Sequence, residues 1–324
     1  MKFSLKLTML GTVLGSMSTI GAGSPLPLSA EQHVAKAKAA ARSEYGAIVP
    51  ALCPQQGPPA DIRVDPSKIE TWYEPPTKVF DNLFFVGQRD VSAWAIKTSG
   101  GLILIDSLYE YSVQPEIIEG LKKLGLDPVS IRYVVVTHGH RDHFGGAKFL
   151  QDRGARIMMS GVDWEMVEAA KGVKPTRDLA VTGPTKLTLG DTTIDIVPTP
   201  GHTPGTISVI FPVRDGGKPH VAAIWGGTGF NSRTEGQIRS YAASARMFIE
   251  VTRKAGVDVA LSNHPIVDST FAKIDKLDHR RPGDENPFVT GWTSERNLLT
   301  MGAECADAQL ALLQTRTSVS SQKN

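Results

Sequence analysis

The chain has 324 residues, 41% hydrophobic and 21% charged, and contains 31 Gly, 21 Pro, 8 His and 2 Cys. These fractions are those of an ordinary globular protein, and they exclude intrinsic disorder, a collagen-like fibre and a small disulfide scaffold. The 35 basic and 33 acidic residues give a formal net charge of +2 without long like-charged runs. We therefore expect neither a nucleic acid nor a membrane as a partner.

The first 23 residues have the layout of a secretory signal peptide. Lys2 and Lys6 flank an apolar stretch over 7–20, and small residues follow at 21–24. The apolar stretch spans about 14 residues, whereas a membrane-spanning helix needs roughly 20. We expect residues 1–23 to be removed on export, which predicts a secreted or periplasmic protein.

Residues 24–76 are predicted to form an N-terminal arm. A helix is expected over 29–43, where alanines alternate with spaced lysines, and a proline-rich connector follows over 50–76. Cys53 lies in this arm and Cys305 lies near the other end of the chain. The sequence leaves open whether the two form a disulfide or remain free buried thiols. Neither lies near a histidine cluster, which argues against a zinc–thiolate site.

Residues 77–324 are predicted to form one domain in which strands alternate with helices. The expected strands lie at 80–87, 92–98, 101–106, 131–137, 155–160, 206–212, 220–227 and 257–264, with two more inside 186–201. The expected helices lie at 113–124, 147–154, 237–255 and 294–314. The run at 131–137 is continuously apolar and β-branched, which predicts a strand buried on both faces. Stacked sheets covered by helices explain this order best.

A dense group of metal-ligating side chains follows the strand at 131–137. Residues 137–146 read THGHRDHFGG and place His138, His140, Asp142 and His143 within six positions. Side chains alternate along extended backbone, so His138 and His140 point the same way. Asp142 and His143 lie where a helix begins. One loop can therefore supply ligands to two adjacent metal ions.

Two further histidines complete a dinuclear site. A catalytic zinc needs about three protein ligands and an open position. His202, in PTPGHTPGT, and His264, in LSNHP, each come directly after an expected strand. Loops at strand ends are where active sites gather. The other histidines, His33, His220 and His279, are interpreted as structural or surface residues.

This motif set, HxHxDH followed by GHTPGT and NHP, resembles the metallo-β-lactamase superfamily over most of the chain after Phe80. The resemblance implies an α/β fold, a four-layer αββα sandwich of the metallo-β-lactamase type, with a dinuclear zinc site. By that resemblance, the first zinc takes His138, His140 and His202, and the second takes Asp142, His143 and His264. His140 stands where iron-dependent members usually carry Glu, which favours zinc.

The resemblance is strongest to the third subclass of metallo-β-lactamases. Most other hydrolases of the superfamily carry an aspartate that bridges both metals, whereas the matching stretch here, 225–231, reads WGGTGFN and has no carboxylate or Cys. That subclass commonly has two serines at this point. Thr228 can replace one hydroxyl, Phe230 cannot, and Asn231 and Ser232 are candidates to compensate.

The implied function is that of a secreted hydrolase that binds two Zn²⁺ per chain and opens a cyclic amide in a small-molecule substrate. A β-lactam is the favoured substrate. Zinc lowers the pKa of bound water, and the resulting hydroxide attacks the carbonyl. Asp142 is expected to orient that hydroxide and accept its proton. Asp106 is predicted either to hold an imidazole of the site or to cap a turn. The alternatives are a lactonase or other ester or thioester hydrolase, and a non-catalytic metal-binding protein.

Overall fold

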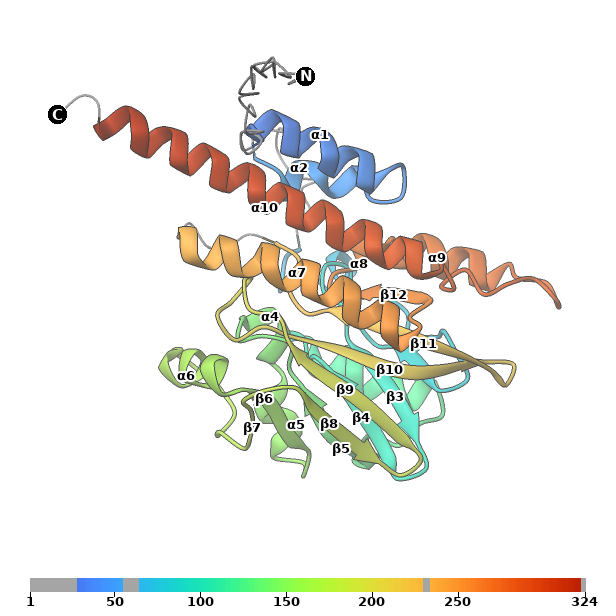
Figure 1. Ribbon diagram of the computed structural model, residues 1–324. Helices are drawn as coiled ribbons and strands as arrows, with labels where there is room; N and C mark the ends of the chain where they lie inside the picture. Colours follow the sequence, from blue (N-terminus) through green and yellow to red (C-terminus); the bar gives the residue numbers. More distant parts are fainter. Residues whose placement is uncertain (1–27, 55–63, 230–233, 322–324) are drawn as a thin grey trace, which may run out of the picture.

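The computed structural model describes residues 28–54, 64–229 and 234–321. Two mixed sheets lie at the centre of the molecule (Figure 1). The first sheet runs in chain order and comprises β1 (Thr77–Lys78), β2 (Leu83–Phe85), β3 (Trp94–Thr98), β4 (Gly101–Ile105), β5 (Ile131–Val135), β6 (Arg156–Ser160) and β7 (Leu179–Val181). The second has the order β12-β11-β10-β9-β8 and comprises β8 (Thr185–Leu189), β9 (Thr192–Pro198), β10 (Ile207–Asp215), β11 (Lys218–Trp225) and β12 (Val259–Ser262).

Helices cover the outer faces of both sheets and form the N-terminal arm. The α-helices are α1 (Ala30–Ala41), α2 (Val49–Leu52), α3 (Glu119–Lys123), α4 (Arg141–Phe144), α5 (Ala147–Gln151), α6 (Gly161–Ala169), α7 (Glu235–Ala255), α8 (Pro265–Asp268), α9 (Thr270–Asp278) and α10 (Trp292–Ser321). Short 3₁₀ turns lie at η1 (Gly46–Ile48), η2 (Ile69–Thr71) and η4 (Pro128–Ser130), and a π-helix, η3 (Val113–Ile118), leads into α3.

Three apolar clusters separate four layers. On β4, Ile103 and Ile105 face the second sheet, whereas Leu102 and Leu104 face the helices around α3 and α5, so this strand is buried on both faces. The second sheet packs its outer face on α7 and α10, as Ala223 and Phe248 illustrate. The layers therefore run helix, sheet, sheet, helix, which confirms the predicted αββα sandwich.

Most predicted elements are present, and the differences have local causes. The predicted helix over 113–124 begins as a π-helix, because Pro115 lies inside it and lacks the N–H of a regular turn. The predicted burial of β5 on both faces is wrong for its first half, since Arg132 is exposed, and right for Val134 and Val135. The structure also contains α6, α8, α9, β1 and β7, which the sequence analysis does not predict.

The N-terminal arm packs on the long C-terminal helix (Figure 1). Val34 and Ala37 of α1 meet Met301 and Ala308 of α10 in an apolar cluster. Cys53 and Cys305 form a disulfide within this cluster, so the first of the two alternatives left open by the sequence is the one observed. The predicted cleavage site and part of the connector lie outside the described residues.

Candidate metal centre

The loop after β5 carries four of the six predicted ligands. His138 is fully buried at the end of the strand, and the chain then turns so that His140 takes the N-cap position of α4. Asp142 and His143 occupy the first turn of that helix, as predicted. The strand and the helix thus direct two pairs of side chains to two neighbouring points.

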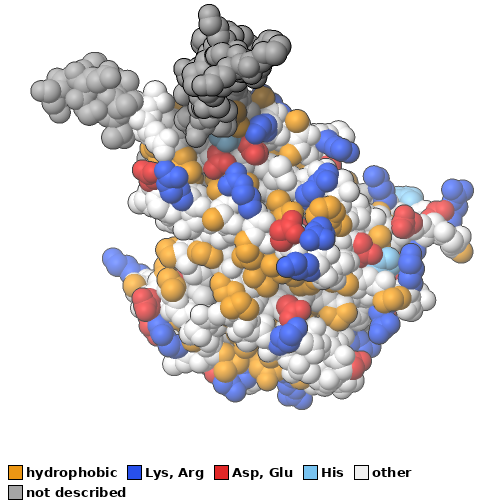
Figure 2. All heavy atoms as spheres, viewed as in Figure 1, with side chains coloured by type: hydrophobic (Ala, Val, Ile, Leu, Met, Phe, Trp, Pro, Cys, Tyr) orange, Lys and Arg blue, Asp and Glu red, His pale blue; other side chains and the backbone are white. Residues whose placement is uncertain are grey.

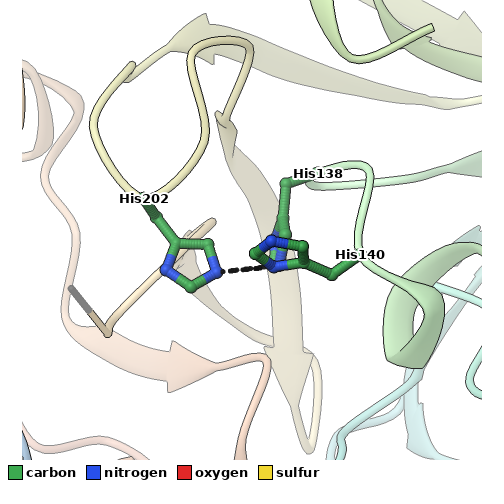
Figure 3. Close-up of side chains that lie close together, drawn as sticks. All are labelled: His138, His140 and His202. Atoms are coloured by element: carbon green, nitrogen blue, oxygen red, sulfur yellow. Dashed lines mark hydrogen bonds between the residues drawn. The ribbon is translucent and has the colours of Figure 1, made fainter. Parts of the chain in front are cut away.

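His138, His140 and His202 form the first triad. The ring nitrogens converge, with His202 Nε2 lying 3.0 Å from His138 Nε2 and 3.1 Å from His140 Nδ1 (Figure 3). His202 comes from the turn after β9, so a residue of the second sheet meets two that follow a strand of the first. The three ligand atoms lie within 4.8 Å of one another.

Asp142, His143 and His264 form the second triad. His264 follows β12, and its Nε2 lies 3.8 Å from Asp142 Oδ2. The rings of His138 and His143 have centroids 4.1 Å apart, which makes the two triads immediate neighbours. The structure therefore brings all six predicted ligands together from three strand ends.

Hydrogen bonds on the outer side of the rings direct the inner nitrogens toward the points where a cation can bind. Four rings are held in this way: His138 by Gly226 O (2.8 Å), His202 by Gly229 O (2.6 Å), His264 by Asp90 O (2.7 Å) and His143 by Asp106 Oδ2 (2.9 Å). These carbonyl and carboxylate oxygens can only accept from the rings, so each Nδ1 carries a proton, and in the neutral rings of His138, His202 and His264 the Nε2 keeps its lone pair. Burial lowers the pKa of His143, but Asp142 and Asp106 outweigh it and raise that pKa to about 10.

Asp106 is the partner of His143, which is the first of the two roles considered for it. Its Oδ1 accepts from the backbone N–H of Thr137 at 2.7 Å, and its Oδ2 also accepts from the hydroxyl of Thr137 at 2.9 Å. Asp106 is 1% exposed and adopts a left-handed backbone with φ of 62°. Such strain in a non-glycine residue costs about 1–3 kcal/mol and is commonly found at functional sites.

Asp163 on α6 is a supporting residue that the sequence analysis misses. Its carboxylate accepts from the backbone N–H of Gly139 (2.8 Å), the hydroxyl of Thr203 (2.6 Å) and the backbone N–H of Gly205 (2.9 Å). These three partners flank His138, His140 and His202 in the chain. Asp163 therefore ties the two loops of the first triad together.

Burial and mutual repulsion keep most of the imidazoles neutral. Burial lowers the pKa of His202 to about 3, and burial together with the neighbouring histidines lowers the pKa of His138. For Asp142, burial acts in the opposite direction, but His143 and His264 outweigh it and hold the pKa of its carboxyl well below the usual range. Neutral imidazoles and an ionised carboxylate are the forms that bind a metal.

The donor set fits zinc. His143 Nε2 is buried without a hydrogen-bond partner, although it lies 3.0 Å from Asp142 Oδ2. A buried polar atom without a partner is costly unless something in the site satisfies it. Each triad offers three ligand atoms, and histidine nitrogens with carboxylate oxygens are typical ligands of catalytic zinc.

Two glycines after the motif allow a second loop to pack on it. A Cβ at Gly145 would lie 2.8 Å from Leu108 O, and one at Gly146 would lie 2.3 Å from Ser107 O. The same loop is hydrogen-bonded here, because the N–H of Ser107 donates to His143 O at 2.8 Å. The Gly-Gly pair is thus required by the close approach of the loop that carries Asp106.

The predicted substrate-binding residues are only partly described. Thr228 is 4% exposed, and its Oγ1 is buried without a hydrogen-bond partner next to the first triad. Its carbonyl oxygen accepts from the hydroxyl of Tyr241 at 2.7 Å, which fixes the backbone there. Asn231 and Ser232, together with Phe230, lie outside the described residues.

The remaining histidines lie away from the two triads. His220 pairs with Asp258, and His279 is exposed near Asp275. His33 belongs to a third cluster of possible ligands with Glu304 and Asp307, which links α1 to α10. In this cluster His33 Nδ1 lies 2.7 Å from Glu304 Oε2, and Arg246 pairs with Asp307. We interpret it as an interhelical ion-pair cluster.

Comparison with known proteins agrees with this geometry. Residues 86–216 match the sequence model of the metallo-β-lactamase superfamily. A type 2 metallo-β-lactamase of Bacillus sp. (strain 170) is 31% identical over 118 residues, which are 36% of this chain and 44% of the relative. A hydroxyacylglutathione hydrolase of Anaeromyxobacter dehalogenans is 38% identical over 77 residues, 24% of this chain and 27% of the relative. The chain thus spans less than half the length of these curated relatives.

Solved structures match over almost their whole length. BJP-1, a subclass B3 metallo-β-lactamase of Bradyrhizobium japonicum, is 28% identical with a TM-score of 0.62, covering 76% of this chain and 97% of its own. A mutant of FEZ-1, a metallo-β-lactamase from Legionella gormanii, is 25% identical with a TM-score of 0.63, covering 78% and 97%.

Two stacked sheets flanked by helices, with a triad of three histidines and an Asp–His–His triad at the strand ends, are the features of the metallo-β-lactamase fold. The chain contains a metallo-β-lactamase superfamily domain, and subclass B3 enzymes are among its structural neighbours. The resemblance predicted from the sequence is thereby confirmed.

Proposed function

We propose that the protein is a secreted hydrolase with two zinc ions that opens a cyclic amide in a small molecule. A β-lactam is the favoured substrate. The observation that carries this proposal is the pair of adjacent triads, which offer six ligands and, among the described residues, no further carboxylate grouped with them. Two zinc ions held there would lower the pKa of a shared water, so that hydroxide is available near neutral pH.

The side chains around the triads have separate tasks in this proposal. Asp142 is 21% exposed, so one face of its carboxylate can orient the attacking water and accept its proton. The unpartnered hydroxyl of Thr228 can donate to the carboxylate that β-lactams carry. Asp106 and Asp163 have a positioning task. Asp106 fixes the ring of His143 and Asp163 fixes the loop of the first triad, so the ligands need not be ordered again during the reaction.

The packing behind the first triad supports a site without a bridging aspartate. A Cβ at Gly226 would lie 1.8 Å from Ile207 O, and one at Gly227 would lie 2.4 Å from His202 Cβ. Neither position can accept a carboxylate side chain without moving its neighbours. The branch of the superfamily with a bridging aspartate is therefore disfavoured by the backbone as well as by the sequence.

Hydrolysis of an ester or thioester, including a lactone, is the second candidate. The similarity to a hydroxyacylglutathione hydrolase favours it, over a shorter stretch than the similarity to the type 2 metallo-β-lactamase. The attack on the carbonyl is the same in both reactions, and only the leaving atom differs.

Parallel assays of the zinc-loaded protein test this proposal. We expect turnover of a chromogenic cephalosporin and little turnover of an acyl-homoserine lactone, with two zinc ions per chain by metal analysis. Turnover of the lactone alone would reverse the order of the two candidates. Two zinc ions without turnover of any acyl substrate would favour a non-catalytic metal-binding protein.

Export is the remaining part of the proposal. Among the described residues, no helix has the length and apolar content needed to span a bilayer. Basic and acidic side chains are interspersed on the face seen in Figure 2, which gives no single-sign surface there. We propose that residues 1–23 are a signal peptide, 24–76 the arm and 77–324 the hydrolase domain. N-terminal sequencing of exported protein should begin near Ser24.

A further inference from the structure

One face of α7 presents three polar side chains to the loops around the first triad. Gln237, Tyr241 and Ser244 are spaced four and three positions apart, so they lie along the same face of the helix. The helix lies between the second sheet and α10 (Figure 1). Tyr241 and Ser244 are buried, and Gln237 is half-buried. Each of the three donates to a backbone carbonyl outside the helix.

Gln237 and Ser244 hold the turn that carries His202. Gln237 Nε2 donates to Gly201 O at 3.0 Å and to His202 O at 3.2 Å, while Ser244 Oγ donates to Pro200 O at 2.8 Å. Gly201 has φ of 153°, and a Cβ there would lie 2.4 Å from a Cα atom of α7. The turn therefore packs against the helix with no room for a side chain between them.

Tyr241 holds a second segment, the stretch of residues 226–229. Its hydroxyl donates to Thr228 O at 2.7 Å, and the indole N–H of Trp225 donates to that hydroxyl at 3.3 Å. Burial raises the pKa of Tyr241, so the hydroxyl stays protonated and able to donate. A Cβ at Gly302 of α10 would lie 3.1 Å from Tyr241 Oη, so the C-terminal helix closes over this hydrogen bond.

The stretch 226–229 in turn orients two rings of the first triad. Gly226 O accepts from the ring of His138 at 2.8 Å, and Gly229 O accepts from the ring of His202 at 2.6 Å. The carbonyl that the tyrosine hydroxyl holds lies between these two in the chain. A shift of the backbone at this point therefore disturbs both ring contacts.

We propose that Tyr241 and Gln237 are positioning residues for the first zinc site, because they fix the backbone segments that orient its ligands. This inference rests on the proposed function, and it names the helix on which the affinity of the first site depends. The second triad is one step further away. Gly226 O also accepts from Asn263 Nδ2 at 2.8 Å, and Asn263 precedes the ligand His264.

The test titrates metal-free protein with Zn²⁺ in a competing chelator. Tyr241→Phe removes only the hydroxyl, and Gln237→Met keeps the length of the side chain without its donor. The matched control is Tyr45→Phe, which removes the hydroxyl of another buried tyrosine, 2.6 Å from Ser294 Oγ in the cluster between the arm and α10. Circular dichroism confirms that each variant is folded.

Two NMR readouts accompany the titration. Imidazole ¹⁵N signals follow the two triads separately, which assigns each binding event to its site. Amide hydrogen exchange in the metal-free protein reports the freedom of the stretch 226–229 without any metal or substrate.

Tyr241→Phe and Gln237→Met should each weaken Zn²⁺ binding at the first triad about 2- to 12-fold, the equivalent of one hydrogen bond, and weaken the second triad less. Exchange in the stretch 226–229 should rise in Tyr241→Phe, and Tyr45→Phe should match wild type in both measurements. A general loss of stability would not select one of two neighbouring sites.

Equal loss at both triads, wild-type affinity in both α7 variants, or a Tyr45→Phe variant as impaired as Tyr241→Phe would overturn the proposal. If Tyr241→Phe does not fold, Gln237→Met decides, because its position is half-buried. If wild type binds two zinc ions but opens no cyclic amide, the proposed function fails, and the zinc titration still decides the role of the two α7 residues.

Discussion

The second triad should depend on Asp106 in a way that Asp106→Asn exposes. Asp106 uses both oxygens, one for Thr137 N–H and the other for Thr137 Oγ1 and His143 Nδ1–H. An amide offers one oxygen, so its NH₂ group must face one of these donors. If it faces His143, the imidazole proton moves to Nε2, which is the atom directed at the metal.

Loss of such an outer partner typically reduces metal affinity 10- to 100-fold. The corresponding free energy is about 1.4–2.8 kcal/mol. Of the six ligands, Asp106 contacts only His143 directly and reaches His138 only through Thr137, so the second zinc site should lose more affinity than the His138–His140–His202 site. Calorimetric titration of metal-free protein with Zn²⁺, in a competing chelator, resolves the two binding events.

Asp195→Asn is the matched control, because Asp195 is an exposed carboxylate on β9 that pairs with Lys186. It should bind both ions as wild type does. The reasoning is refuted if Asp106→Asn retains two sites of wild-type affinity, or if both sites weaken equally while circular dichroism shows a folded protein.

Three further predictions address ligands, pH and the arm. His138→Ala should lose zinc and activity together, whereas His279→Ala should keep both, as metal analysis with turnover assays will show. Burial raises the pKa of Glu295 to about 8 from 4.5, and neither of its oxygens has a hydrogen-bond partner. A carboxyl with a raised folded-state pKa makes stability fall as pH rises from about 4.5 to 8, because the unfolded chain ionises first. Glu295→Gln should therefore be more stable by on the order of 3 kcal/mol at pH 7 and equal to wild type near pH 4 in urea unfolding; parallel pH profiles would contradict this. Replacing Cys53 and Cys305 by Ser opens a disulfide between residues 252 positions apart and should cost about 2–5 kcal/mol, measured as a lower Tm, without loss of zinc.

The six ligands could be predicted from sequence because each signal is local. His138, His140, Asp142 and His143 lie within one short motif, and alternation along the strand gives their directions. His202 comes directly after a strand of a different sheet and is recognised by its Pro/Gly turn. The fold could be predicted for the same reason, since its strands carry short continuous apolar runs such as those of β4 and β10.

The supports of the ligands could not be predicted in the same way. Gly226, Gly229 and Asp90 hold imidazoles through backbone carbonyls, and a carbonyl has no residue signature. Asp163 lies on a helix that the periodicity does not reveal, and only its complete burial marks it. The left-handed backbone of Leu108, in the loop that carries Asp106, is unusual for leucine and cannot be predicted from the sequence.

The contact between Gly145–Gly146 and the loop of residues 106–111 bears on how such an enzyme can evolve. A side chain at either glycine would push away the backbone that carries Asp106, so the support of His143 would change with it. The two glycines and the length of the loop of residues 106–111 must therefore be inherited as a unit.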